Sequence, residues 1–83
     1  MLDQKVVNWN TDYGKIESHL KKCLEKKHMS KYKLCRLTGI KTEIINKYYY
    51  NRITRFDREV LAKICYVLDC DVFDIITYIP KDN

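Results

Sequence analysis

One glycine, Gly39, places the strongest constraint on how this chain folds, because it lies between two short amphipathic stretches. On its N-terminal side, Leu34, Cys35 and Leu37 share one apolar face of a helix that Ser30 can cap. A glycine adopts positive φ without steric cost, so the chain can turn sharply at this point. The sequence therefore predicts a helix over residues 31–38 that ends in a tight turn.

The stretch after the turn has two opposed faces. Its apolar side chains recur with helical period at Ile44, Ile45, Tyr48 and Tyr49. The other side of the same stretch carries polar groups at Glu43, Asn46, Lys47 and Tyr50. A helix, a glycine turn and a second helix make up a helix-turn-helix unit. The sequence thus indicates a helix over residues 42–50 whose polar face is open to solvent and able to read DNA.

The segment from Ser30 to Tyr50 resembles the phage repressor and Cro (Xre-type) DNA-binding family, and the resemblance extends over residues 15–80. It is carried by the Ser-x-x-x-Leu-small pattern, the Thr-Gly-Ile turn and Ile45. It continues downstream through Leu61, Ile64, Leu68 and Asp74-Ile75-Ile76. Three positions depart from the family pattern. Members usually have a Ser or Thr cap where this chain has Lys41, commonly a Gln at Lys31, and often an Asn-Gly turn at Tyr50-Asn51-Arg52.

Periodicity and the resemblance together predict an all-α fold, a compact five-helix domain of the lambda-repressor type with a short N-terminal arm. We expect the helices near residues 13–27, 31–38, 42–50, 58–68 and 72–78. The predicted caps are Ser30, Asp57 and Asp71, and the inner stripe of the first helix is Ile16, Leu20 and Leu24. This divides the chain into an arm (1–13), a DNA-binding domain (14–80) that Pro80 ends, and a tail (81–83).

The resemblance implies that the helix over residues 42–50 enters the major groove of duplex DNA. The candidates for contact with base edges are Thr42, Glu43, Asn46 and Lys47. In this scheme Asn46 pairs with adenine, Lys47 donates to guanine, and Glu43 accepts from cytosine. The candidates for phosphate contact are Lys31, Lys41, Tyr50, Asn51, Arg52 and Arg55.

Charge is distributed unevenly along the chain. The formal net charge is +5, but residues 15–58 alone carry +9, while residues 59–83 carry −3 and residues 1–14 carry −1. The helix-turn-helix lies inside the basic block. A basic patch is typical of a surface that binds phosphates, although many small domains have a basic surface that only faces water. The coincidence of patch and motif favours DNA binding.

The cysteines and histidines do not indicate catalysis or metal binding. No Cys-x-x-Cys pair occurs among the four cysteines, which are Cys23, Cys35, Cys65 and Cys70. The first three are interpreted as small buried hydrophobes. Cys70 is the one that we expect to be partly exposed. His19 and His28 have no catalytic partner at a telling spacing and are read as surface residues. We therefore predict a protein that is not an enzyme and has no cofactor or metal.

The run of three tyrosines has more than one interpretation. Tyr48 belongs to the inner stripe and is expected in the core with its hydroxyl at the rim, while Tyr49 is ambiguous. Tyr50 lies on the outer stripe, where its phenol can donate to a phosphate or simply shield the neighbouring loop. Stacking on a single strand is a further alternative, which the helix-turn-helix makes less favoured.

Assembly and partners are less constrained. A homodimer is expected, because one short recognition helix reads too few base pairs to find its site. Its contact could use the apolar surface at Val72, Phe73, Tyr78 and Ile79, or the arm at Val6, Val7 and Trp9. Trp9 and Tyr13 could instead cover the first helix.

The alternative function is a protein-interaction module, such as the antitoxin of a toxin–antitoxin pair, with an unknown protein partner. Charges interrupt each apolar stretch and no signal peptide is recognised, so no membrane contact and a cytoplasmic location are expected.

Overall fold

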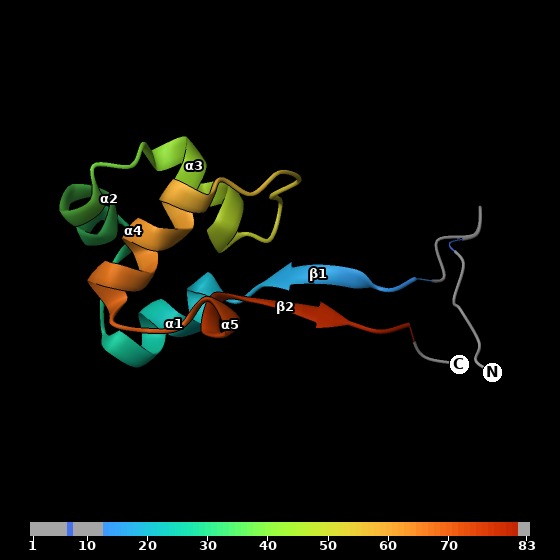
Figure 1. Ribbon diagram of the computed structural model, residues 1–83. Coiled ribbons are helices and arrows are strands. Elements are labelled where there is room, and N and C mark those ends of the chain that lie inside the picture. Colours follow the sequence, from blue (N-terminus) through green and yellow to red (C-terminus); the bar gives the residue numbers. More distant parts are fainter. Residues whose placement is uncertain (1–6, 8–12, 82–83) are drawn as a thin grey trace.

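The computed structural model describes residue 7 and residues 13–81. Within these residues the chain forms five helices: α1 (Leu20–Lys27), α2 (Lys31–Thr38), α3 (Thr42–Tyr49), α4 (Arg58–Leu68) and α5 (Val72–Ile75). Two strands, β1 (Lys15–Ser18) and β2 (Ile76–Ile79), flank the helices in the sequence. The helices gather into one body, and the two strands extend from it side by side (Figure 1). The helical prediction is confirmed for this body, but the strictly all-α prediction is wrong.

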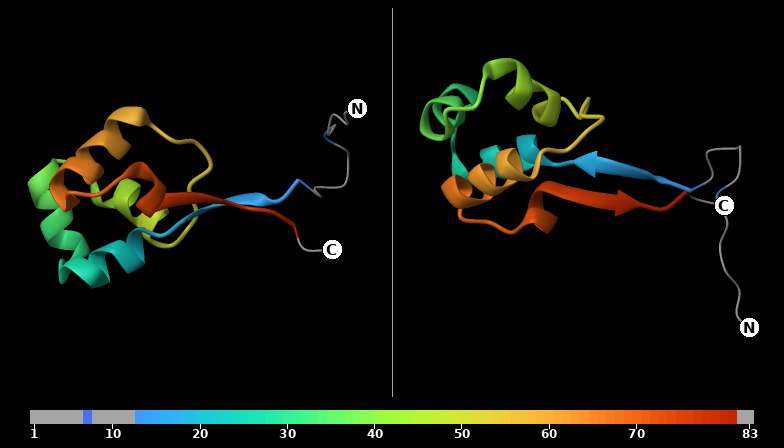
Figure 2. Two further views of the ribbon diagram at one scale, coloured as in Figure 1. Left: turned by 60° about the horizontal axis from the view of Figure 1, so that its bottom comes forward. Right: turned by 45° about the horizontal axis from the view of Figure 1, so that its top comes forward.

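The two strands form an antiparallel ribbon. Ile16 lies opposite Tyr78 and Ser18 opposite Ile76, so segments about sixty residues apart in the sequence are paired. Two further views show the same projection away from the helices (Figure 2). Each strand has only the other as its partner among the described residues. The ribbon therefore leaves one edge of each strand open.

The first predicted helix, over residues 13–27, begins too early. Gly14 has a φ of 85°, which ends any helical continuation, and residues 15–18 are extended. Ile16 fits the i, i+4, i+8 spacing with Leu20 and Leu24, but it is 51% exposed on the ribbon rather than packed inside. The spacing is coincidental here, because antiparallel pairing with β2 satisfies the backbone of this segment instead.

The last predicted helix, over residues 72–78, ends too late. α5 stops at Ile75, and Ile76 has φ −129° and ψ 141°, which is extended backbone. Ile76 and Thr77 are β-branched and Tyr78 is aromatic, residue types that favour strands. Pairing with β1 stabilises the extended conformation of this segment. A local sequence pattern cannot reveal this pairing, because β1 lies at the other end of the described chain.

The predicted helix caps are confirmed. The Ser30 side chain accepts a hydrogen bond from the Lys33 backbone N–H at 3.0 Å, and Asp57 accepts from two backbone N–H groups at the start of α4. Asp71 and Asp74 form a capping box at the start of α5. Each cap satisfies backbone donors that the first turn of a helix leaves unpaired.

The core lies where α1, α2, α3, α4 and α5 converge. Its buried side chains are Leu20, Leu24, Leu34, Ile40, Ile45, Tyr48, Ile64, Leu68 and Ile75. Leu37, expected on the apolar face of α2, is half exposed, so that part of the prediction is wrong. Tyr48 is in the core as expected, but its hydroxyl is buried without a hydrogen-bond partner among the described residues, rather than lying at the rim.

Only part of the predicted arm and tail is described. Tyr13 is half exposed, and its carbonyl oxygen accepts a hydrogen bond from the Tyr78 hydroxyl at 2.7 Å. The expected contacts of Val6 and Trp9 lie outside the described residues, as do residues 82 and 83. Across the part of the chain that is described, no helix is long and apolar enough to span a membrane.

Candidate nucleic-acid interface

The turn between α2 and α3 is built by Gly39 and its neighbours. Gly39 has φ 75° and ψ 9°, the left-handed conformation expected from the sequence, and its N–H donates to the Cys35 carbonyl oxygen at 2.8 Å. The Thr38 hydroxyl donates to the Leu34 carbonyl at 2.7 Å and accepts from the Ile40 N–H at 3.2 Å. Ile40 is buried in the core. These contacts set the direction in which α3 leaves the turn.

The two faces of α3 are oriented as the sequence indicated. Ile45 and Tyr48 are fully buried, which fixes the rotation of the helix against the body. Thr42, Glu43 and Lys47 are exposed on the other side. Lys41, the N-cap residue, has an extended backbone and makes no side-chain capping bond, as expected for a lysine where the family has Ser or Thr. Glu43 lies in the first turn of α3, where its negative charge also interacts favourably with the helix dipole.

Lys31 links the start of α2 to the C-terminal half of α3. Its ammonium Nζ donates to the Asn46 side-chain oxygen Oδ1 at 2.9 Å and to the Tyr50 hydroxyl at 3.0 Å. The same nitrogen lies 4.5 Å from the ring centroid of Tyr49 and 4.6 Å from that of Tyr50. A cation over an aromatic face is attracted by the ring quadrupole. The Lys31 ammonium is therefore held by four groups of α3 and its C-cap.

Tyr50 is half exposed beside this lysine. Because Lys31 donates a hydrogen bond to its oxygen and adds a positive charge, the pKa of Tyr50 is lowered. Tyr49 packs edge-on against Tyr50 with 4.9 Å between ring centroids. The guanidinium of Arg52 also lies close to this ring, 5.2 Å from the Tyr50 ring centroid. The end of α3 thus carries a phenol with two cations near its ring.

The residues after α3 have different environments. Asn51 adopts a positive φ of 58°, and its Oδ1 accepts a hydrogen bond from the Ser18 N–H at 2.8 Å. This contact ties the end of α3 to the end of β1. The Arg52 N–H donates to the Lys47 carbonyl oxygen at 2.7 Å, while the Arg52 and Arg55 side chains are exposed. The predicted site residues Lys31, Asn46, Tyr50 and Arg52 are thus brought together, and Asn51 also has a structural contact.

Comparison with known families agrees with this arrangement. The profile of the Cro/C1-type HTH DNA-binding domain matches residues 19–81. This chain belongs to that family. The family consists of DNA-binding domains and not of enzymes, as the sequence indicated. No curated protein matches the chain.

Two solved structures show how the Cro/C1-type fold recurs. The transcriptional regulator VanUg is 27% identical in sequence, with a TM-score of 0.68 over 92% of this chain and 100% of its own. A candidate DNA-binding protein from Bacteroides fragilis is 19% identical, with a TM-score of 0.66 over 76% of this chain and 100% of its own. At that lower identity the likeness concerns the fold alone.

The sequence did not reveal how Lys31 and Tyr49 act in this Cro/C1-type domain. The resemblance favours a phosphate contact for Lys31 and the pattern leaves Tyr49 ambiguous, whereas the structure places both in one cluster with Asn46. The sequence signal for this cluster is Lys31 itself, because the family commonly has Gln at this position. The helix-turn-helix layout brings the start of α2 near α3, so a lysine there faces the polar groups of the second helix.

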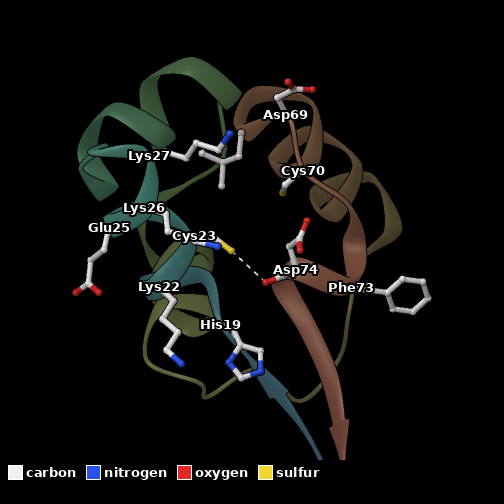
Figure 3. Close-up of a pocket in the computed structure, with 11 residues that line it drawn as sticks. His19, Lys22, Cys23, Glu25, Lys26, Lys27, Asp69, Cys70, Phe73 and Asp74 are labelled. Atoms are coloured by element: carbon white, nitrogen blue, oxygen red, sulfur yellow. Dashed lines mark hydrogen bonds between the residues drawn. The ribbon is translucent and has the colours of Figure 1, made fainter.

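Away from this cluster, a hollow of about 970 Å³ lies between α1 and the α4–α5 junction (Figure 3). The Cys23 thiol on its wall donates to the Asp74 carbonyl oxygen at 3.1 Å. Burial raises the pKa of Cys23 and raises that of Cys70 to about 11, so both thiols are protonated at neutral pH and poorly nucleophilic. All four cysteines are partly buried, so the expected contrast between Cys70 and the others is wrong.

His19, which also borders this hollow, is not the simple surface residue that was expected. Its Nε2 is hydrogen-bonded to the Thr77 hydroxyl at 2.7 Å, across 58 residues of sequence. Its backbone N–H donates to the Ile75 carbonyl oxygen at 2.6 Å. His19 therefore joins the start of α1 to the junction of α5 and β2, a structural role.

Proposed function

We propose that this protein is a sequence-specific duplex-DNA-binding transcriptional regulator that reads the major groove with α3. The observation that carries the proposal is the orientation of α3. Ile45 and Tyr48 are fully buried on one side of this helix, while Thr42, Glu43 and Lys47 are exposed on the other. A helix seated in this way is rigid, and its exposed side chains can be presented to base edges in the groove. The regulatory role is supported by the likeness to VanUg, a transcriptional regulator.

Base reading is assigned to four side chains on the polar face, of which Asn46 is partly buried and the others are exposed: Thr42, Glu43, Asn46 and Lys47. Thr42 and Glu43 are at the N-terminal end of the helix, which enters the groove first in this docking mode. Glu43 can accept from the amino group of cytosine, and Lys47 can donate to guanine. A carboxylate so close to DNA is repelled by phosphates unless it meets a donor. Glu43 therefore contributes selectivity rather than affinity.

Phosphate contacts are assigned to groups on either side of that face. Lys41 precedes α3, and Tyr50, Arg52 and Arg55 follow it, all four with exposed side chains. Asn51 keeps its side-chain NH₂ available, because only its oxygen bonds to β1. Such contacts set the register of the protein on DNA without reading sequence. The net charge of +9 over residues 15–58 favours binding of phosphates by this part of the chain.

We also propose that the protein acts as a homodimer on a near-palindromic site. Two half-sites about 34 Å apart would supply the base pairs that one short helix cannot read. The projecting ribbon is the surface proposed for the contact. Ile16 and Tyr78 are opposite one another in register, on one face, and both are more than half exposed. A two-stranded ribbon is marginally stable alone, so a second copy would also stabilise it.

The proposal is tested by selecting bound duplexes from a random DNA pool. We expect enrichment of a near-palindrome with the wild-type protein. Glu43→Ala should relax the preference at one position of each half-site and raise the affinity for unselected DNA. Glu59→Ala, an exposed carboxylate in the first turn of α4, is the matched control and should leave the selected sequence unchanged. Failure of the wild type to enrich any sequence would contradict the proposal.

A further inference from the structure

Most of the hydrogen-bonding capacity of the Lys31 ammonium is used within the domain. A lysine has three N–H donors and no acceptor. Two of the three are used, toward the Asn46 Oδ1 and the Tyr50 hydroxyl, and the rings of Tyr49 and Tyr50 cover the cation at about the same distance. The third N–H has no hydrogen-bond partner among the described residues. The head of Lys31 is thus fixed against α3, unlike that of a lysine that extends freely to a phosphate.

This fixed cation determines the orientation of the Asn46 amide. Because Lys31 can only donate, the group that faces it must be the amide oxygen and not the NH₂. The NH₂ of Asn46 is then the part of the side chain that is left to contact a base. Asn46 is partly buried but not enclosed in the core, so part of the residue remains accessible to DNA.

We infer that Lys31 is a specificity-determining residue, which makes Asn46 read a guanine instead of an adenine. The inference rests on the proposed function, since it concerns the base contacted by α3. An adenine contact by asparagine needs the amide oxygen to accept from the adenine amino group while the NH₂ donates to N7. Here one of the two lone pairs of that oxygen already accepts from a cation, whose positive charge repels the amino hydrogens of adenine.

Guanine fits the same arrangement. Its major-groove edge presents two neighbouring acceptors, N7 and O6, and no donor. The Asn46 NH₂ and the remaining N–H of Lys31 form a surface of donors only, one group neutral and the other charged. Two donors on two acceptors give a contact that adenine and cytosine cannot match, because both present an amino group at that edge.

Tyr50 is placed to support the guanine contact by holding the neighbouring phosphate. Its hydroxyl oxygen accepts from Lys31, so its own proton is free to be donated, and the cation makes that proton more acidic. A phosphate oxygen beside the base is a suitable acceptor. The cluster would thus read one base through Asn46 and Lys31 and hold the neighbouring phosphate through Tyr50.

The test is duplex selection with the full-length protein and three variants. Asn46→Ala identifies the base pair that the amide reads, because preference at that position should be lost. At this position the wild type should prefer guanine over adenine by roughly tenfold or more. Lys31→Met removes the donors but keeps a long side chain, and it should shift the preference to adenine. Lys33→Met, an exposed lysine of the same helix, loses the same charge and should keep guanine.

Thermal unfolding of each variant establishes that the Lys31→Met protein is folded before its selected sequence is read. Adenine at the Asn46-dependent position in the wild type would overturn the inference and leave the proposed function standing. Retention of guanine in Lys31→Met, or no position that depends on Asn46, would overturn it in the same way. If the wild type enriches no duplex at all, the proposed function fails as well.

Discussion

Replacing Gly39 by alanine tests the turn that positions α3. Gly39 has a φ of 75°, and the left-handed conformation costs a residue with a Cβ roughly 1–2 kcal/mol. A Cβ added there would meet no atom of the described residues within 4 Å, so no steric clash with them increases this cost. Alanine also restricts the unfolded chain, which returns about 0.4–1 kcal/mol. We therefore expect Gly39→Ala to lower the free energy of unfolding by about 1 kcal/mol, or the Tm by roughly 4–8 °C.

The matched control is Gly39→Asn, because asparagine tolerates the left-handed conformation better than alanine. Urea and thermal unfolding followed by circular dichroism should rank the wild type above Gly39→Asn and Gly39→Asn above Gly39→Ala. The m-value should not change, since all three fold to the same surface. An alanine variant as stable as the wild type would refute the reasoning. Equal losses in both variants would also refute it, because the cost would then not depend on φ.

Three further outcomes follow from single contacts. Arg52→Ala and Arg55→Ala should each reduce the steepness of the log–log dependence of duplex affinity on salt by about 0.9, and an unchanged slope measured by anisotropy would remove that arginine from the phosphate contacts. Tyr48→Phe should raise the free energy of unfolding, by up to about 1 kcal/mol, because it removes a buried hydroxyl whose contact with the Asp57 backbone falls outside hydrogen-bond geometry; a loss of that size would show that the hydroxyl is bonded to Asp57. Asn51→Ala should cost about 1–2 kcal/mol, since it loses both the bond to Ser18 and a side chain suited to positive φ, while Asn51→Gly should lose less in the same unfolding assay.

The helical body could be predicted because its signals are local. The caps at Ser30, Asp57 and Asp71 and the left-handed turn at Gly39 are set by residues within one helical turn of each other. The ribbon could not be predicted in this way. Ile16 and Tyr78 pair across the length of the domain, and each lies in a segment whose spacing also fits a helix. Only the long-range pairing decides between the two.

The sequence predicted which face of α3 is exposed, but not the hydrogen bonds that join the candidate site residues to other elements. Helical periodicity correctly separated the buried Ile45 from the exposed Lys47. It could not show that Lys31 bonds to Asn46, because these two side chains come from different helices and meet only after the turn has formed. Nor could it show that the oxygen of Asn51 is occupied by β1. Contacts between elements depend on tertiary packing, which a pattern within one helix does not contain.

The most direct test of the central claim compares two lysines on a duplex that the protein has selected. Lys47 lies on the exposed face of α3 and Lys63 is exposed on α4, so changing either to alanine removes the same charge. At one fixed salt concentration, Lys47→Ala should weaken binding by roughly tenfold, the loss expected for a base contact, and should weaken discrimination against a scrambled duplex. Lys63→Ala should change neither quantity appreciably. Equal losses for the two variants, with discrimination unchanged in both, would contradict the claim that α3 reads the DNA.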